Sequence, residues 1–157
     1  MHPDSERRVQ AALPPLRVSW SLMLAASLGW AWLGAIASPA GSPPDATATP
    51  PFTMALAALG ALCALATLWI DRAIITPERM AALMPVPDHA LAQRHLLAGH
   101  LALWSLAVLP ALFGFAQLLL GGALATHLAL CAASLAILAL LMPTRARIAA
   151  RLEAVLH

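Results

Sequence analysis

Polar positions interrupt the apolar pattern of the chain at intervals that leave four long hydrophobic runs. Each run holds about twenty residues, the length that a helix needs to cross the roughly 30 Å hydrocarbon core of a bilayer. The expected spans cover residues 18–38, 52–70, 96–120 and 123–142. We therefore predict an all-α membrane protein with four transmembrane helices arranged as two helical hairpins.

Two short amphipathic helices are expected outside the membrane, one after the second span and one after the fourth. Thr76, Pro77 and Glu78 supply a hydroxyl cap, a proline at the first helical position and an acid in the first turn. Thr144 can cap a second, basic helix over residues 145–156 in the same way. Both helices are expected to lie along the cytoplasmic interface.

These elements define four segments of the chain. They are an N-terminal cytoplasmic segment (1–17), a first hairpin with its interfacial helix (18–84), a linker (85–95) and a second hairpin with its basic C-terminal helix (96–157).

An offset of 68 residues aligns several pieces of the chain with one another. Residues 61–64 (Ala-Leu-Cys-Ala) align with 129–132, and Thr76 aligns with Thr144. Apolar identities match by accident often, whereas a shared cap outside the membrane is more specific. A duplication would place two similar hairpins around an axis along the membrane normal; coincidence is the alternative.

The basic residues indicate an orientation. All nine are arginines, and they flank the N-terminus, the connection between spans two and three, or the C-terminus. The loops 39–51 and 121–122 contain none. Because cytoplasmic loops are enriched in basic residues, we predict a multi-pass protein of the bacterial inner membrane with both termini in the cytoplasm.

The first apolar run could instead be a signal peptide, since residues 35–37 (Ala-Ile-Ala) resemble a cleavage site. At about twenty residues it is longer than a typical signal core, so we interpret it as a span.

Composition excludes several classes of function. Of 157 residues, 61% are hydrophobic and 10% are charged, against about a quarter charged in soluble domains. The mean hydropathy is +0.81. Little chain is left for a soluble catalytic domain, and a net charge of +2 gives no basis for nucleic-acid binding. The expected partners are membrane lipids and other membrane-protein subunits.

The third span carries small and polar residues along one side. At 100° per residue this side comprises His100, Ala107, Pro110, Gly114, Gln117 and Gly121. Large residues such as Leu112 and Leu119 fall on the opposite side. Helix–helix contacts in membranes favour small and polar residues, so we predict that the other spans pack against this face.

Individual residues within the spans each have a structural and a functional interpretation. His100 is expected to hydrogen-bond a neighbouring helix; the alternatives are a proton relay, a haem or metal ligand, and a lipid contact. His127 is expected near the outer face, far from His100, so no matched pair for haem exists. Cys63 and Cys131 are interpreted as small buried hydrophobes rather than a disulfide or metal pair.

Polar residues of the spans are expected to play structural roles. Pro110 is expected to bend its helix rather than gate a path, and Gln117 to form an interhelical hydrogen bond. The hydroxyl side chains can bond back to carbonyls of their own helices; these are Ser27, Thr67, Ser105 and Ser134.

Four arginines of the two amphipathic helices suit anionic lipid headgroups or the cytoplasmic side of a partner, and ordinary topogenic charge is the alternative. They are Arg79, Arg145, Arg147 and Arg151.

The order Pro-Ala-Leu-Phe-Gly at 110–114, a Gly-Gly turn, and an apolar span ending in Pro143 before a basic helix resembles a class of uncharacterised four-span bacterial membrane proteins. More distantly, residues 94–152 are similar to the double hairpin of rotary-ATPase proteolipid (c) subunits. That resemblance implies an ion-binding glutamate six residues before the glycine that matches Gly114. Val108 stands there instead, so the ion carrier that the resemblance implies is missing.

Three functions remain open: a non-catalytic accessory or scaffold subunit, a small oligomeric transporter or channel component, and a haem- or cofactor-associated subunit. No span contains a carboxylate and no paired ligands are apparent, which disfavours the last two. We therefore expect the first, without enzymatic activity, cofactor or metal.

Overall fold

The computed structural model describes residues 3–37, 51–73 and 89–156, and every regular element among them is an α-helix. The elements are α1 (Pro3–Ala37), α2 (Pro51–Ala73), α4 (His89–Leu119), α5 (Leu124–Leu140) and α6 (Arg145–Leu156). The predicted all-α class is therefore confirmed. Within these described ranges, three segments are long and apolar enough to cross a membrane: Val9–Ala37, Pro51–Arg72 and Arg94–Leu119.

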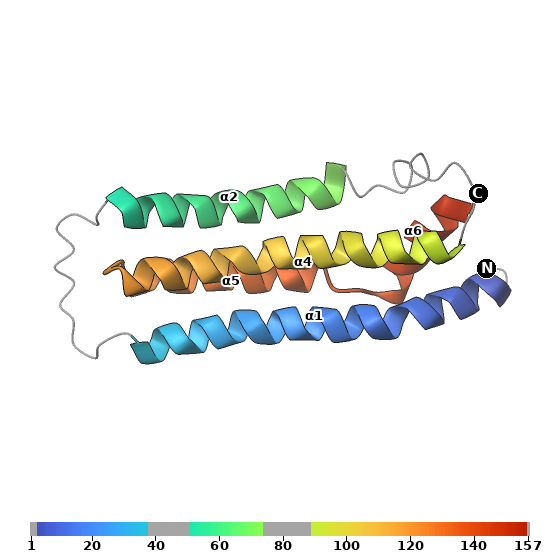
Figure 1. Cartoon of the computed structure of the whole chain (residues 1–157), viewed down its shortest axis with the longest axis horizontal. Helices are drawn as coiled ribbons and strands as arrows, with labels where there is room; N and C mark the ends of the chain where they lie inside the picture. The colour runs from blue at the N-terminus through green and yellow to red at the C-terminus, as the bar shows by residue number, and fades with distance from the viewer. Residues whose placement is uncertain (1–2, 38–50, 74–88, 157) are drawn as a thin grey trace.

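The long helix α4 lies at the centre of the molecule, with α1 on one side of it and α2 on the other (Figure 1). The shorter helix α5 runs back along α4 and also contacts α1 and α2. The helix α6 packs against α1 at the end where both chain termini lie. The two helices of the expected first hairpin thus make their main contacts with α4.

The helix α1 continues through the expected boundary at residue 17 and contains Pro14 and Pro15 in its interior. A proline inside a helix removes a hydrogen bond and bends the chain. Packing holds the N-terminal turns in place, because Val9 and Leu16 are buried in one cluster with Leu96 of α4 and Ile148 of α6.

A tight turn joins α4 to α5, as the sequence predicts. The amide of Gly122 donates to the carbonyl of Gln117 (2.9 Å) and the amide of Gly121 to that of Leu118 (3.1 Å), the pair of bonds that defines a Schellman cap. Gly121 has φ +86°, a conformation that side chains with a Cβ rarely adopt. The side-chain amide of Gln117 donates to the carbonyl of Ala123 (3.0 Å) and braces the turn.

The fourth apolar helix is shorter than the expected span over 123–142. It has 17 residues, or roughly 26 Å at 1.5 Å per residue. Pro143 ends it early, because a proline disfavours helical geometry in the residue before it. Thr144 then caps α6, its hydroxyl accepting a hydrogen bond from the amide of Arg147 (3.3 Å), which confirms the predicted helix start. The other expected amphipathic helix, with Arg79, lies outside the described residues.

Candidate functional site

A buried stripe follows α4 along the side that the sequence singles out. His100, Ala107, Pro110, Gly114 and Gln117 are all buried, whereas Gly121 is exposed in the turn. The stripe is wider than its small and polar members, because large apolar residues continue it. The additional buried residues of α4 are Leu96, Leu103, Trp104 and Ala111. Together with the small and polar positions, these residues recur every three or four positions, a period that the apolar pattern of the sequence also contains.

Three glycines, one from each long helix, face two residues of α5. A Cβ at Gly34 of α1 would lie 2.0 Å from Nε2 of His127. One at Gly60 of α2 would lie 3.2 Å from a methyl carbon of Leu130, and one at Gly114 of α4 would lie 3.1 Å from Cβ of Leu130. The absence of side chains at these glycines lets α5 approach the three helices closely.

The His127 side chain fills the space between α1 and α4 near the turn. Its ring contacts Phe115 edge-on, with centroids 6.2 Å apart, and Phe115 in turn contacts Trp30 at 5.1 Å. The sulfur of Cys131 lies 3.7 Å from both ring nitrogens, within the range of a weak hydrogen bond. In the described part of the chain, no group of three histidine, cysteine or acidic side chains is placed to hold a metal ion.

A hydrogen-bonded serine pair links α1, α5 and α4. The hydroxyl of Ser134 donates to the carbonyl of Ala107 (2.7 Å), so its oxygen accepts the proton of Ser27 (3.0 Å). The expectation that these two serines bond to their own helices was wrong, because both hydroxyls face a neighbouring helix. The same expectation is confirmed for Thr67, which donates to the carbonyl of Cys63 four residues earlier (2.7 Å).

Side chains of three other helices cap the last carbonyls of α5. The indole N–H of Trp20 in α1 donates to Leu138 (2.8 Å), and that of Trp104 in α4 donates to Leu141 (3.3 Å). The guanidinium of Arg147 in α6 donates to Leu140 (2.8 Å). Helix ends leave carbonyls without intrahelical partners, and such groups are costly where water is excluded. These donors allow a short helix to end beside longer ones.

The structure describes the contacts of His100 and Arg145, two of the polar residues that the sequence singles out. The Nδ1–H of His100 donates to the carbonyl of Leu96 in the same helix (2.8 Å), and the ring lies 5.3 Å from that of Trp104. Arg145 forms an exposed ion pair with Glu6 of α1. The side chain of Arg151 lies outside the described residues.

The side of α5 that faces away from the other helices carries a stripe of alanines, with the exposed leucines Leu128 and Leu140 beside it. Its exposed alanines recur every three or four positions: Ala125, Ala129, Ala132, Ala136 and Ala139. We call these five residues the alanine face. The exposed side of α2 instead presents large side chains, among them Leu62, Leu65 and Trp69, each more than 60% exposed.

Comparison of the chain with protein-family models, curated proteins and solved structures gives no match. The resemblance to four-span bacterial membrane proteins therefore stays an expectation.

Proposed function

We propose that the protein is a non-catalytic accessory or scaffold subunit of a membrane complex, and that the alanine face of α5 packs against a transmembrane helix of a partner subunit. The observation that carries this proposal is the contrast between this face and the large exposed side chains of α2. Lipid tails are as apolar as leucine, so association in a bilayer depends on close packing, which alanines allow.

The proposal includes a membrane topology. In it, α5 serves as a fourth span, and both termini face the cytoplasm of a bacterial cell. Two features support this. The described arginines belong to the N-terminal half of α1, the end of α2, the start of α4 and α6, and these parts lie toward one end of the molecule (Figure 1). The described residues at the opposite end, around Ala37, Pro51 and Gly121, include no charged side chain.

Thiol labelling of cells tests the topology. Asp45→Cys, Met80→Cys and Ala150→Cys are introduced singly after Cys63 and Cys131 have been replaced by alanine. An impermeant reagent outside the cytoplasmic membrane should label position 45 and leave positions 80 and 150 unlabelled until the membrane is opened. Labelling of position 150 in intact cells would reverse the orientation.

Site-specific photocrosslinking tests the function. A benzophenone amino acid at position 132 should give one discrete protein adduct in native membranes, identified by mass spectrometry. The same probe at Ala58, an exposed alanine of α2, should give lipid adducts only. The substitution Ala132→Leu should reduce recovery of the partner about tenfold, as expected for a loss of about 1.4 kcal/mol; Ala58→Leu is the matched control.

The kind of adduct at position 132 distinguishes a partner subunit from lipid and from a second copy of the chain. Lipid adducts alone at position 132 would contradict the proposal. An adduct of twice the chain mass would favour the oligomeric transporter or channel component instead.

A further inference from the structure

The exposed large apolar side chains of the described residues form one band around the bundle. On α1 they extend from Val18 to Ile36, on α2 from Phe52 to Trp69, and on α5 from Leu124 to Leu140, with Met142 just beyond. At 1.5 Å per residue these three stretches measure about 27, 26 and 24 Å. On α4 they are confined to residues 112–120. We call this band the apolar belt.

Two contacts between α1 and α5 show that the belt ends at the same depth on both helices. The indole N–H of Trp20 donates to the carbonyl of Leu138, and Gly34 lies against the ring of His127. The two helices run in opposite directions (Figure 1). These contacts therefore place the first and last residues of the α1 stretch level with the end and the start of α5.

The other two helices follow the same levels. Gly60 of α2 lies against Leu130 of α5, 70 positions later, and these helices run in the same direction (Figure 1). The same offset maps residues 52 and 69 onto residues 122 and 139, close to the two ends of α5. On α4, Trp104 donates to the carbonyl of Leu141, so the turns of α4 before Trp104 lie beyond the end of α5.

The apolar sequence of α1 extends further than the belt. Its apolar segment begins at Val9, in the turns that precede Val18. Val9 and Leu16 are buried in one cluster with Leu96 of α4 and Ile148 of α6. Beyond the belt, three helices thus bury their large side chains against one another. We call this part the head; it comprises residues 3–17 of α1, 89–100 of α4 and 145–156 of α6.

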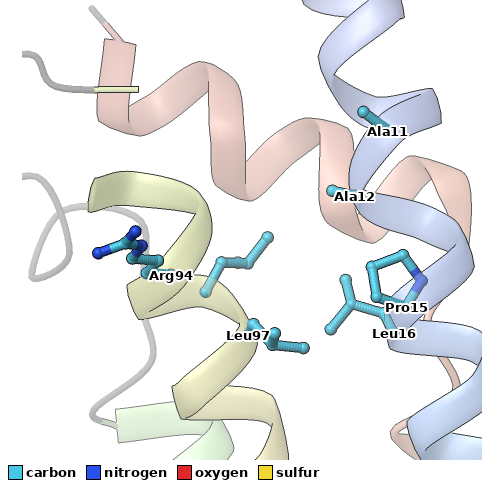
Figure 2. Close-up of a pocket in the computed structure, with 7 residues that line it drawn as sticks. Ala11, Ala12, Pro15, Leu16, Arg94 and Leu97 are labelled. Atoms are coloured by element: carbon cyan, nitrogen blue, oxygen red, sulfur yellow. The ribbon is translucent and has the colours of Figure 1, made fainter. Parts of the chain in front are cut away.

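The surface of the head differs from the belt. Figure 2 shows the part of it where α1 faces α4, around a small pocket. The exposed residues that line this pocket are Ala11, Pro15 and Arg94, whereas Leu16 and Leu96 are buried. No large apolar side chain described in the head is exposed.

Charged residues mark the boundary between head and belt. Exposed arginines follow or precede the belt directly: Arg17 adjoins Val18, and Arg72 comes three residues after Trp69. A guanidinium is costly inside hydrocarbon, and the long side chain of arginine reaches the interface only from near a helix end. Tryptophan is enriched at the membrane–water interface, and Trp69 is exposed at this boundary.

We propose that acyl chains reach no further along the helices than the apolar belt, and that the lipid partner of the protein is a bilayer with a hydrocarbon core about 26 Å thick, below the roughly 30 Å of a typical bilayer. The head then lies among headgroups and water. Immersion of the whole apolar segment of α1, 29 residues, would instead take about 43 Å. The inference rests on α5 crossing the membrane, as in the proposed topology, but not on a partner for the alanine face.

Nitroxide labels on the full chain in dioleoylphosphatidylcholine vesicles test where the belt ends. Cysteine replaces Ala11, Leu28 or Ala98, all exposed, after Cys63 and Cys131 have been changed to alanine. A label at position 28 should collide more often with oxygen, which concentrates in hydrocarbon, than with a water-soluble nickel chelate. Labels at positions 11 and 98 should show the reverse. An excess of oxygen collisions at position 11 or 98 would overturn the proposal, whatever the crosslinking of the alanine face shows.

A series of phosphatidylcholines with cis-monounsaturated acyl chains tests the thickness. The full chain is reconstituted in dimyristoleoyl, dipalmitoleoyl, dioleoyl, dieicosenoyl and dierucoyl lipid, and thermal unfolding is followed by circular dichroism. The midpoint should be highest in dioleoyl or shorter lipid and about 5 °C lower in dierucoyl lipid, because mismatch opposes the folded state. A maximum in dieicosenoyl or dierucoyl lipid would overturn the proposal.

A pair of arginine variants tests the boundary itself. Arg17→Leu extends the belt by one position and removes the adjoining charge, so the decrease in dierucoyl lipid should become smaller. Arg7→Leu, at an exposed arginine of the head, should leave the decrease unchanged. Equal effects of the two variants would contradict a boundary at Arg17.

Discussion

The inner and outer faces of α5 differ in the size of the side chains that they present. On the inner face α5 contributes the larger side chains, His127 and Leu130, and the neighbouring helices contribute glycine. On the outer face α5 presents the alanine face, and Leu128 and Leu140 are exposed beside it. Small residues let membrane helices approach closely, and at these inner contacts of α5 the glycine stands on the neighbouring helix alone. A partner of the outer face is therefore expected to supply the larger side chains.

The two faces also differ in polarity. The inner face contains the hydrogen-bonded Ser27–Ser134 pair and the contacts of His127. The alanine face offers no side chain that can form a hydrogen bond. Substitutions on the inner side should thus change the stability of the isolated chain. Those on the outer side should change only association.

The largest effect on stability is expected at the closest contact of the inner face. Gly34→Ala places a methyl group within 2.0 Å of the His127 ring and should lower the free energy of unfolding by about 3 kcal/mol, the upper range for overpacking. The measurement is thermal or denaturant unfolding in detergent.

Gly29 provides the control for this variant. It lies in the same helix, and a Cβ there would meet nothing within 4 Å. Gly29→Ala should be neutral, or stabilising by about 0.5–1 kcal/mol because alanine is the better helix former. Equal losses in both variants would show that α5 does not approach α1 as described.

An intermediate effect is expected where α5 ends. Trp104→Phe keeps an aromatic ring but removes the donor to the buried carbonyl of Leu141, and should cost about 2 kcal/mol. Trp69→Phe, on the exposed side of α2, should change the unfolding midpoint little. If the two variants behave alike, the capping of α5 contributes nothing to stability.

The smallest change in the free energy of unfolding is expected from the Ser27–Ser134 pair. Ser134→Ala removes two interhelical hydrogen bonds, and such bonds average about 0.6 kcal/mol each in membrane proteins. Ser105→Ala changes an exposed hydroxyl of α4 and serves as the comparison. If Ser105→Ala lowers the free energy of unfolding as much as Ser134→Ala, the interhelical hydrogen bonds of Ser134 do not stabilise the inner face.

Local features of this protein follow from the sequence by itself. The apolar runs predict helices, Gly121 and Gly122 predict the turn, and Thr144 predicts the start of α6, because each depends on residues close together in the chain. The face of α4 that carries Ala107 and Gly114 is likewise fixed by the period of the helix.

Only the tertiary structure decided which helices meet and at what depth. Nothing local distinguishes Gly34 from Gly29, yet one faces His127 and the other faces open space. Ser134 is equally able to bond within its own helix, and it reaches Ala107 because α5 is rotated toward α4. The rotation and shift of one helix against another depend on the summed fit of many side chains distant in sequence. For the same reason the alanine face could be identified as exposed only after the positions of α1, α2 and α4 around α5 were known.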